Sequence, residues 1–472
     1  MTSVGEQGAK TWHFVGIGGI GMSAIARILL ARGQCVSGSD VKETALIARL
    51  REEGAEVTIG HDAANIERAH TVIVSSAIDR HNPEYLAAQR RNIPLLHRGE
   101  MLAELLRNRS GIAICGTHGK TTTTAMIAAV LRAGNVDASL VLGGIDGSLG
   151  TNACDGRSPW FVTEADESDG SFALLDPKIA IVTNIENDHL QSDDELPQLV
   201  RAFEEFLRKL PEEGCAIVGV DDPLAASLVE RERRTRTVTF GFGPRADVRA
   251  GNVRAQGLGV SFDAIVDDVC LGTVELNVPG AINVQNALAA IAAAREVEVP
   301  FARIAEGLSL FRGVRRRFDI LVRTDRMVLV DDYAHHPTAV RATIAAARQY
   351  HGGPVIVAFQ PHRYSRTAYL ARDFADALKG ADRVYLAPVY AASEPAIPGV
   401  SERSIGEPLA ALGTHVTYVT RVDELEERLF EEAPRGALVL MLGAGNITDV
   451  AANLAKSLLR GEGTHVVGRG GA

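Results

Sequence analysis

The sequence predicts an α/β protein whose chain folds into three consecutive domains, each built on a largely parallel β-sheet. The first observation is length, because 472 residues exceed what one hydrophobic core usually organises. The second is the repeated alternation of short β-branched runs with helical apolar patterns, which is typical of strands joined by crossover helices. The third is a glycine-rich turn between a strand and a helix, which occurs twice, at Gly16 and Gly116.

The first domain is expected over residues 1–108. Its apolar pattern predicts, in order, a buried strand at 13–17, a helix at 22–31 and further strands at 34–38 and 71–75. A polar break at 107–110 then precedes a new strand. This alternation predicts a parallel sheet with helices on its faces.

The second domain is expected over residues 109–313 and the third over residues 314–472. Strands of the second domain are predicted at 112–115, 160–163, 179–183 and 215–220. The stretches 238–240 and 260–266 are predicted as additional antiparallel strands, and a helix at 286–294 closes the domain. Strands of the third domain are predicted at 327–331, 355–359, 383–386, 415–419 and 437–442.

Composition narrows the class of protein. The 49 basic and 59 acidic residues give a net charge of -10, which argues weakly against non-specific nucleic-acid binding. The five cysteines form no CxxC pair, which indicates reduced thiols and no zinc site. The first ten residues are polar, unlike a signal peptide, and no run reaches the roughly 18 apolar residues of a membrane span. We expect a cytoplasmic protein without membrane insertion, as a monomer or homodimer.

The first glycine turn has the pattern GxGxxG directly between a strand and a helix. Its backbone N–H groups and the helix N-terminus can hold a diphosphate, and Asp40 follows the next strand, where such folds meet a ribose. A dinucleotide-binding protein, or a tight turn without ligand, has the same pattern, so these residues leave the nucleotide open. The candidate binding residues are Gly16, Gly18, Gly19, Ile20, Gly21, Met22, Ser23 and Asp40.

The second glycine turn is shorter than the standard phosphate-binding loop, because only two residues separate Gly116 from Gly119. Its mechanics are the same: backbone amides face the phosphates, Lys120 offers a mobile cation, and the Thr121 hydroxyl can reach Mg²⁺. A glycine turn with a surface lysine is the alternative, but it leaves the threonines after Lys120 unexplained. The candidate triphosphate-binding residues are Gly116, Thr117, His118, Gly119, Lys120, Thr121 and Thr122.

Two polar segments follow later strands of the second domain. Glu164 opens the acidic cluster EADESD after one strand, and His189 follows the next. Open α/β sheets bind ligands at the carboxyl ends of their strands, so we predict that both residues bind divalent ions together with Thr121. The alternatives are a solvated acidic loop and a structural histidine.

Together these motifs resemble the Mur ligase family over almost the whole chain. GTHGKTTT with histidine at position 118 is similar to the alanine-adding members, whereas sister enzymes tend to have asparagine there. The other signatures follow in the family's order: EADESDGSF (164–172), TNIENDHL (183–190), RRRF (315–318), DDYAHHPT (331–338), FQPHRYSRT (359–367) and GAGNI (443–447).

The resemblance implies a three-domain architecture, with an N-terminal Rossmann-like domain, a central P-loop ATPase-like domain and a C-terminal Rossmann-like domain. It also implies an ATP-dependent, ADP-forming ligase of peptidoglycan precursor synthesis. Such an enzyme joins L-alanine to the carboxylate of UDP-N-acetylmuramate through an acyl phosphate, with Mg²⁺, for which Mn²⁺ can substitute.

The resemblance also assigns roles to residues. The first turn would hold a UDP-sugar with the help of Ser75, Ser76 and Arg98. Lys120, Glu164 and His189 would be catalytic, the last two as metal ligands. Asn283 and Asn286 would meet adenine, and Arg316 and Arg317 the ATP phosphates. Residues expected to face the carboxylate and the amino acid are Tyr333, His335 and Arg366.

Four positions depart from the family pattern: Gln191, Ile282, Ala339 and Ser393, where aspartate, histidine, glutamate and glycine are usual. Among rival functions, the nearest is a recycling ligase that attaches a whole tripeptide to the same UDP-sugar. An NAD-dependent oxidoreductase would use the first turn and leave Lys120 idle. A kinase and a non-catalytic nucleotide sensor complete the alternatives.

Overall fold

The computed structural model describes residues 10–167, 170–187, 195–231 and 235–461. The chain divides into two compact units. The first unit comprises Met1–Glu186, Gln198–Val248 and Ala289–Gly307, and the second comprises Asn187–Pro197, Arg249–Leu288 and Leu308–Ala472. The domain boundaries predicted at residues 108 and 313 stay predictions.

The first unit begins with a parallel sheet of order β3-β2-β1-β4-β5. Its strands are β1 (Thr11–Val15), β2 (Cys35–Asp40), β3 (Glu56–Ile59), β4 (Thr71–Val74) and β5 (Leu95–His97). The helices are α1 (Ile20–Ala31), α2 (Ala45–Glu52), α3 (Pro83–Arg91) and α4 (Arg98–Leu106), with a 3-10 turn η1 (Ala63–Ile66). The strand order reverses direction beside β1, so the first glycine turn, which follows β1, lies at the switch point where such sheets bind ligands.

The same unit contains a second set of strands in the order β12-β11-β10-β6-β9-β7-β8. They are β6 (Ser110–Cys115), β7 (Ser139–Val141), β8 (Ala153–Cys154), β9 (Trp160–Glu164), β10 (Ile179–Val182), β11 (Cys215–Gly219) and β12 (Arg236–Gly241). The helices are α5 (Lys120–Ala133), α6 (Leu196–Leu207) and α7 (Pro223–Arg231), with a 3-10 turn η2 (Ser171–Leu174). The carboxyl ends of β6, β9 and β10 share one edge because these strands are parallel.

One predicted direction is wrong. The stretch 238–240 was expected in an antiparallel strand, but β12 pairs in parallel with β11. The reason is α7, which lies between the two strands in sequence and returns the chain so that β12 runs in the same direction as β11. The other antiparallel prediction is confirmed, because β14 (Gly259–Val266) pairs antiparallel with β15 (Val269–Leu276).

The second unit holds β13 (Val248–Gln256), β14 and β15, and a sheet of order β16-β17-β21-β18-β19-β20. The strands of this sheet are β16 (Asp319–Arg323), β17 (Met327–Asp332), β18 (Val355–Phe359), β19 (Arg383–Leu386), β20 (His415–Tyr418) and β21 (Ala437–Leu442). All are parallel except the edge strand β16. Helix α8 (Ala281–Glu296) is divided between the two units after Leu288, and most of α9 (Phe301–Leu310) belongs to the first unit.

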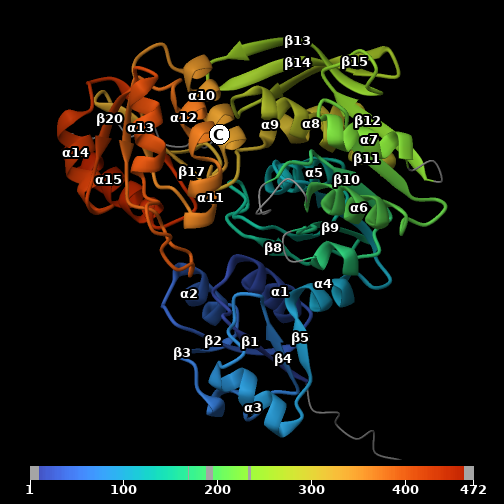
Figure 1. Ribbon diagram of the computed structural model, residues 1–472. Coiled ribbons are helices and arrows are strands. Elements are labelled where there is room, and N and C mark those ends of the chain that lie inside the picture. Colours follow the sequence, from blue (N-terminus) through green and yellow to red (C-terminus); the bar gives the residue numbers. More distant parts are fainter. Residues whose placement is uncertain (1–9, 168–169, 188–194, 232–234, 462–472) are drawn as a thin grey trace, which may run out of the picture. The chain divides into compact units, whose positions relative to one another are not determined.

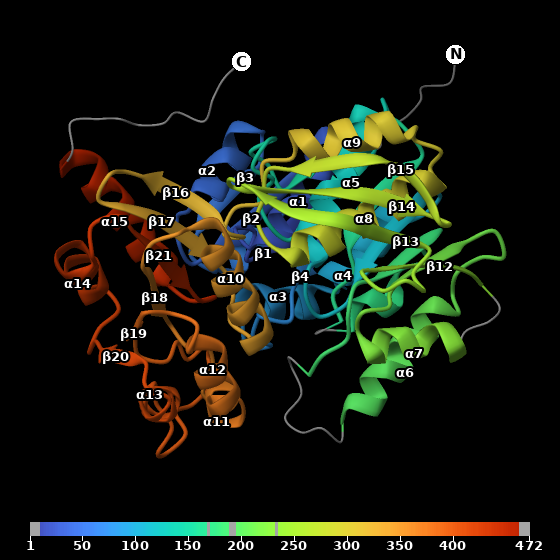
Figure 2. The ribbon, with the colours of Figure 1, turned by 90° about the horizontal axis from the view of Figure 1, so that it is seen from above.

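Helices cover both faces of the sheet in the second unit (Figure 2). One face packs on α10 (Pro337–Tyr350), α12 (Ala371–Leu378) and α13 (Arg403–Ala411), and the other packs on α14 (Glu424–Glu432) and α15 (Ile447–Gly461). Burial on both faces explains why β18 and β21 are continuous apolar runs, Val355–Phe359 and Ala437–Leu442, without polar alternation.

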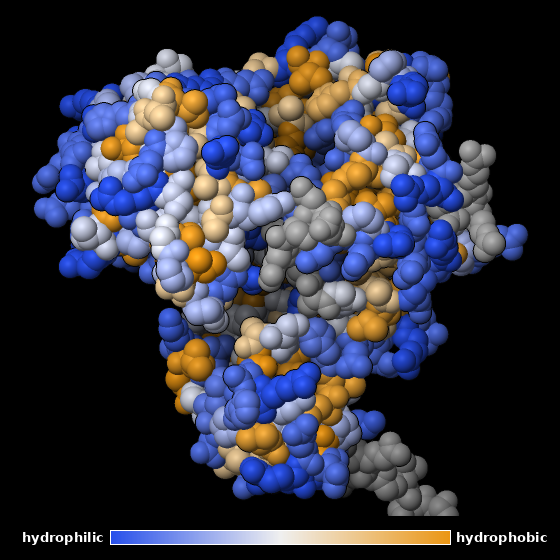
Figure 3. Space-filling view, viewed as in Figure 1, coloured by the Kyte–Doolittle hydropathy of each residue, from blue (hydrophilic) through white to orange (hydrophobic). Residues whose placement is uncertain are grey.

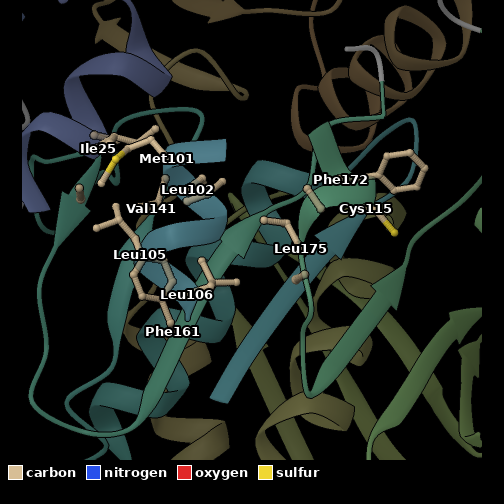
Figure 4. Packing of buried hydrophobic residues seen from close by; sticks show 14 of the residues in the cluster. Ile25, Met101, Leu102, Leu105, Leu106, Cys115, Val141, Phe161, Phe172 and Leu175 are labelled. Carbon is tan, nitrogen blue, oxygen red and sulfur yellow. The ribbon is translucent and has the colours of Figure 1, made fainter. Parts of the chain in front are cut away.

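In the first unit, one hydrophobic core joins the N-terminal sheet to the central strands. Its members include Ile25 of α1, Met101 and Leu106 of α4, and Val141 and Phe161 of the central strands. Figure 4 shows Met101 beside Ile25, and Leu106 beside Phe161. Helix α1 also contacts β7 and β8 (Figure 1). The two glycine turns therefore belong to one packed body.

Hydrophilic residues predominate on the face that Figure 3 displays, and apolar residues form separate patches there. Among the described residues, no helix combines the length and apolar character needed to cross a membrane.

Candidate active site

The first glycine turn is held by the end of β2. The backbone N–H groups of Gly16 and Ile17 both donate to the carbonyl oxygen of Ser39, at 2.8 and 3.0 Å. The N–H of Gly18 donates to a carboxylate oxygen of Asp40 at 2.9 Å. A Cβ at residue 18 would lie 2.9 Å from that oxygen, so glycine is required for this close approach. Asp40 thus stabilises the conformation of the turn. The contact of Asp40 with a ribose stays a prediction.

Helix α1 begins directly after this turn, with Gly19 at its N-cap. The end of the helix faces the turn, which favours an anion there. Two of the predicted binding residues have buried side chains: Met22 belongs to the core, and the Ser23 hydroxyl donates to the carbonyl of Ile20 at 3.0 Å. The backbone N–H of Ser23 donates to the carbonyl of Gly19 at 2.8 Å, so contact of these two residues with a ligand stays a prediction.

Arg98 lies near this turn, and Ser75 and Ser76 follow β4, the strand that pairs with β1. A Cβ at Gly21 would lie 3.2 Å from a guanidinium nitrogen of Arg98, so the structure brings these two predicted residues together. Arg98 also pairs with Asp166 at 2.8 Å. The Ser76 hydroxyl lies 3.0 Å from Nε2 of His97, and Ser75 is half-buried. Asp166 was not singled out from the sequence.

The second glycine turn follows β6 and leads into α5, whose first residue is Lys120. Gly116 has φ +115°, and a Cβ there would collide with the hydroxyl of Thr183. Gly119 has φ +88° at the N-cap of α5. Residues that carry a side chain rarely adopt either backbone conformation, so both glycines are needed to turn the backbone sharply.

The segment after β10 supports this turn from the side. The N–H of His118 donates to the side-chain oxygen of Asn184 at 2.8 Å, and the Thr183 hydroxyl donates to the carbonyl of His118 at 2.7 Å. Nε2 of His118 lies 3.1 Å from a carboxylate oxygen of Glu186. The backbone N–H of Glu186 donates to the hydroxyl of Thr117. The role of Thr183 and Asn184 was missed. Their position after a strand parallel to β6 was the available signal.

Lys120 binds the acidic cluster. Its ammonium donates to both carboxylate oxygens of Glu167, at 2.8 and 2.9 Å, and to the carbonyls of Gly116 and Thr117, at 2.6 and 3.3 Å. Burial acts to lower the pKa of Lys120, but the nearby carboxylates, above all Glu167, outweigh burial and raise that pKa. Lys120 is therefore a cation at neutral pH, held at the mouth of the turn.

Glu164 ends β9 and faces the same turn. One carboxylate oxygen accepts a hydrogen bond from the Thr121 hydroxyl at 2.9 Å, and the other accepts one from the N–H of Gly143. The predicted metal ligands Thr121 and Glu164 are thus adjacent. His189, the third predicted ligand, lies outside the described residues, as does Gln191.

The remaining predicted residues belong to the second unit. Asn283 and Asn286 lie on the first turns of α8, and the Asn286 amide donates to the side-chain oxygen of Asn283 at 3.2 Å. Asn286 is buried. Their contact with adenine stays a prediction.

Four other predicted residues of the second unit form a cluster centred on Tyr333, which follows β17. The guanidinium carbons of Arg316 and Arg317 lie 4.8 and 5.1 Å from the ring centre of Tyr333, and the His335 ring lies 5.0 Å from that ring centre. Arg366 is buried on α11 (Tyr364–Tyr369), which follows β18. Because β17 and β18 both flank β21 in parallel, these segments leave the sheet at one edge.

The chain is similar to known proteins over most of its length. The chain matches three family models, described as "Mur ligase family, catalytic domain" over residues 11–110, "Mur ligase middle domain" over 114–294 and "Mur ligase, glutamate ligase domain" over 316–445. It is 47% identical over 446 residues to a UDP-N-acetylmuramate–L-alanine ligase of Acidithiobacillus ferrooxidans, covering 93% of this chain and 96% of the relative. A protein of the same name from Agrobacterium fabrum is 43% identical over 453 residues, covering 94% and 96%.

Two solved structures have folds similar to that of this chain. The crystal structure of the UDP-N-acetylmuramate-alanine ligase MurC from Thermotoga maritima superposes with a TM-score of 0.83 at 31% identity, covering 96% of this chain and 100% of that one. A murein peptide ligase from Psychrobacter arcticus gives a TM-score of 0.73 at 24% identity, covering 95% and 99%. The second likeness concerns the fold alone.

Proposed function

The chain belongs to the Mur ligase family, and on that premise we propose that it joins L-alanine to the carboxylate of UDP-N-acetylmuramate while converting ATP to ADP and phosphate. The proposal places the protein in peptidoglycan precursor synthesis in the cytoplasm. The observation that carries it is the joining of two glycine turns in one packed unit, with Lys120, Thr121 and Glu164 gathered at the second.

The chemistry is proposed to run in two steps. A carboxylate oxygen of the UDP-sugar bonds to the γ-phosphorus of ATP, and the bond from that phosphorus to the ADP oxygen breaks, which leaves an acyl phosphate. The amine of alanine then bonds to the acyl carbon, phosphate leaves with the C–O bond electrons, and the amine proton passes to solvent. Neither step needs a nucleophile from the protein. The protein positions two anions against each other and offsets the charge that develops.

Lys120 is the cation that this proposal needs at the second turn. Its pairing with Glu167 orients the ammonium towards the turn, where phosphate oxygens can replace the carbonyls of Gly116 and Thr117 as acceptors. The backbone amides of the turn supply further donors to the phosphates.

Glu164 and Thr121 fit a magnesium ion, because a carboxylate and a hydroxyl in contact are the hard oxygen ligands that Mg²⁺ prefers. We propose that these two residues and His189 hold divalent ions. When bound, the ion offsets negative charge on the phosphates. Gly143 fixes the second oxygen of Glu164, so the carboxylate keeps its orientation without the ion.

For the UDP-sugar we propose the amides of the first turn, with Asp40, Ser75, Ser76 and Arg98 around them. In the second unit we propose that Tyr333, His335 and Arg366 bind the amino acid and the muramyl carboxylate. Arg316, Arg317, Asn283 and Asn286 would bind ATP. The guanidinium groups of Arg316 and Arg317 both lie over the Tyr333 ring, and the planar fork of a guanidinium suits bidentate contact with phosphate.

The decisive experiment supplies purified protein with UDP-N-acetylmuramate, ATP and Mg²⁺, and measures phosphate release with each amino acid in turn. We expect release that requires all components, with the highest kcat/KM for L-alanine over glycine and serine. Phosphate release that is independent of an amino acid would instead indicate an ATPase, and ADP formation without phosphate release would indicate a kinase. A higher kcat/KM for a tripeptide than for alanine would indicate the recycling ligase.

A further inference from the structure

A buried asparagine links the first glycine turn to the central strands. Asn152 precedes β8 and has no exposed surface. Its side-chain amide donates to the carbonyl of Ile20 at 2.7 Å and to the hydroxyl of Ser23 at 2.9 Å, both on the first turn of α1. Its side-chain oxygen accepts a hydrogen bond from Arg27, one turn further along the same helix. Asn152 thus hydrogen-bonds to the N-terminal end of α1, which follows the GxGxxG turn.

The orientation of this amide is fixed by its partners. The guanidinium of Arg27 can only donate, so the group facing it must be the oxygen of Asn152, and the NH₂ group must face Ile20 and Ser23. Arg27 is itself buried and anchored by Glu53 at 2.7 Å. A rotated amide would lose its hydrogen bonds to both Arg27 and the carbonyl of Ile20, which favours this single orientation.

The backbone of the same residue leads towards the second glycine turn. The carbonyl of Asn152 accepts a hydrogen bond from the N–H of Leu142 at 2.9 Å. The next N–H, that of Gly143, donates to Glu164. The other oxygen of Glu164 accepts from Thr121 on α5. A Cβ at Gly143 would lie 2.8 Å from the Glu164 carboxylate, so the backbone of residue 143 is in close contact with it.

The loop between these contacts is internally braced. The carboxylate of Asp146, which is 1% exposed, accepts from the N–H groups of Ser148 and Leu149 at 2.7 and 2.8 Å. The backbone of Asp146 also pairs with that of Thr151 at 3.0 Å. These hydrogen bonds connect residues 146 to 151 within the compact loop that separates residue 143 from residue 152.

We propose that Asn152 is a positioning residue that couples the first glycine turn to Glu164 and Thr121, so that the UDP-sugar and the Mg²⁺-nucleotide each strengthen binding of the other. The inference rests on the proposed function. The proposed coupling requires no contact between Asn152 and either ligand. Coupling between two sites is reciprocal, and typical values are on the order of 5- to 150-fold in affinity.

The test is a binding cycle by calorimetry, without alanine. A non-hydrolysable ATP analogue with Mg²⁺ is titrated into the protein with and without saturating UDP-N-acetylmuramate. We expect the sugar nucleotide to lower the analogue's Kd by about fivefold or more in the parent. In Asn152→Ala we expect the two Kd values to agree within about twofold, with each ligand alone still bound.

Arg32→Ala is the matched control. Arg32 is the C-cap residue of the same helix, at the opposite end from the first glycine turn, and pairs with Asp155, just after β8, at 3.0 Å. This control should keep the coupling of the parent. Asn152→Asp is the second variant, because it has the size of the parent side chain, keeps the acceptor for Arg27 and lacks the NH₂ donor. It should fold and lose the coupling.

Three results would overturn the inference: an uncoupled parent, parent-like coupling in both Asn152 variants, or equal loss in Arg32→Ala. Failure of the proposed function is separate from these outcomes. It would appear as a parent protein that binds neither the sugar nucleotide nor the ATP analogue.

Discussion

Replacing Lys120 by methionine tests both the charge of the site and its packing. The substitution keeps an unbranched side chain and removes the ammonium that pairs with Glu167 at 2.8 and 2.9 Å. Side-chain exposure is 17% for Lys120 and 5% for Glu167, so the remaining carboxylate would be buried without its counter-charge. Removing one partner of a buried ion pair costs about 3–5 kcal/mol of stability. Loss of a preorganised charge at the reacting phosphate costs about 3 kcal/mol in the barrier, on the order of a hundredfold in rate.

The double variant Lys120→Met/Glu167→Gln separates these two effects. Glutamine removes the unpaired charge, so we expect most of the lost stability to return while turnover stays at least about a hundredfold below the parent. Urea unfolding measures the first quantity, and phosphate release under saturating substrates measures the second. Equal stability of the single and double variants would refute the role assigned to the ion pair. Parent-like turnover in either variant would refute the role assigned to Lys120.

The pH dependence provides an independent check on the single variant. Burial raises the pKa of Glu167, and Lys120 opposes that rise in the parent. Without the ammonium, the pKa of the folded carboxyl rises further above its unfolded value of about 4.3. The folded state then holds more protons than the unfolded state, so stability falls as pH increases through this window. We expect the stability deficit of Lys120→Met to shrink between pH 7 and pH 5, and a constant deficit would contradict the explanation.

Three further substitutions test other parts of the structure. Gly116→Ala places a Cβ against the hydroxyl of Thr183 at φ +115°, so titration with an ATP analogue should show at least about tenfold weaker binding, and an unchanged Kd would contradict the geometry of the turn. Glu164→Gln should raise the Mg²⁺ concentration for half-maximal activity, and overlapping magnesium titrations would place the ion elsewhere. Glu84→Ala should lower the free energy of unfolding at pH 7 by about 3 kcal/mol, because this unexposed carboxylate accepts from Ser39 at 2.6 Å. Burial acts to raise the pKa of Glu84, but its hydrogen bonds outweigh burial and lower that pKa, so its ionised form stabilises the parent above about pH 4.3 and the benefit is lost as pH falls through the lowered pKa. Identical urea midpoints at pH 7 for Glu84→Ala and the parent would contradict this prediction.

Local patterns were sufficient for the strands and for both glycine turns. The buried strand before Gly116 is a run of small and branched apolar residues, and Lys120 follows as the first residue of α5. The pairing of Glu164 with Thr121 was also predictable. Glu164 ends β9 and Thr121 comes after β6, and the carboxyl ends of these two parallel strands meet at one edge of the sheet.

The direction of a strand relative to its neighbour was harder to predict from the sequence. The stretch within β12 has the same alternation in a parallel or an antiparallel pair, and the helix that decides between them, α7, is only nine residues long. A pattern of period two reports which face of a strand is buried and not which way its neighbour runs.

The amino-acid sequence by itself determined the chain's family, its α/β class and the residue types that phosphate chemistry requires, because glycine turns, a lysine at a helix start and acids after strands are local features. Tertiary structure alone decided which acid pairs with Lys120: among the three carboxylates at 164, 166 and 167, it is Glu167, while Asp166 binds Arg98 and Glu164 binds Thr121. It also revealed Asn152, which lies more than 120 residues from its partners Ile20 and Ser23. The physical reason is that side-chain direction after a strand end, and contact across such a separation, are set by packing against the rest of the core, which no local pattern encodes.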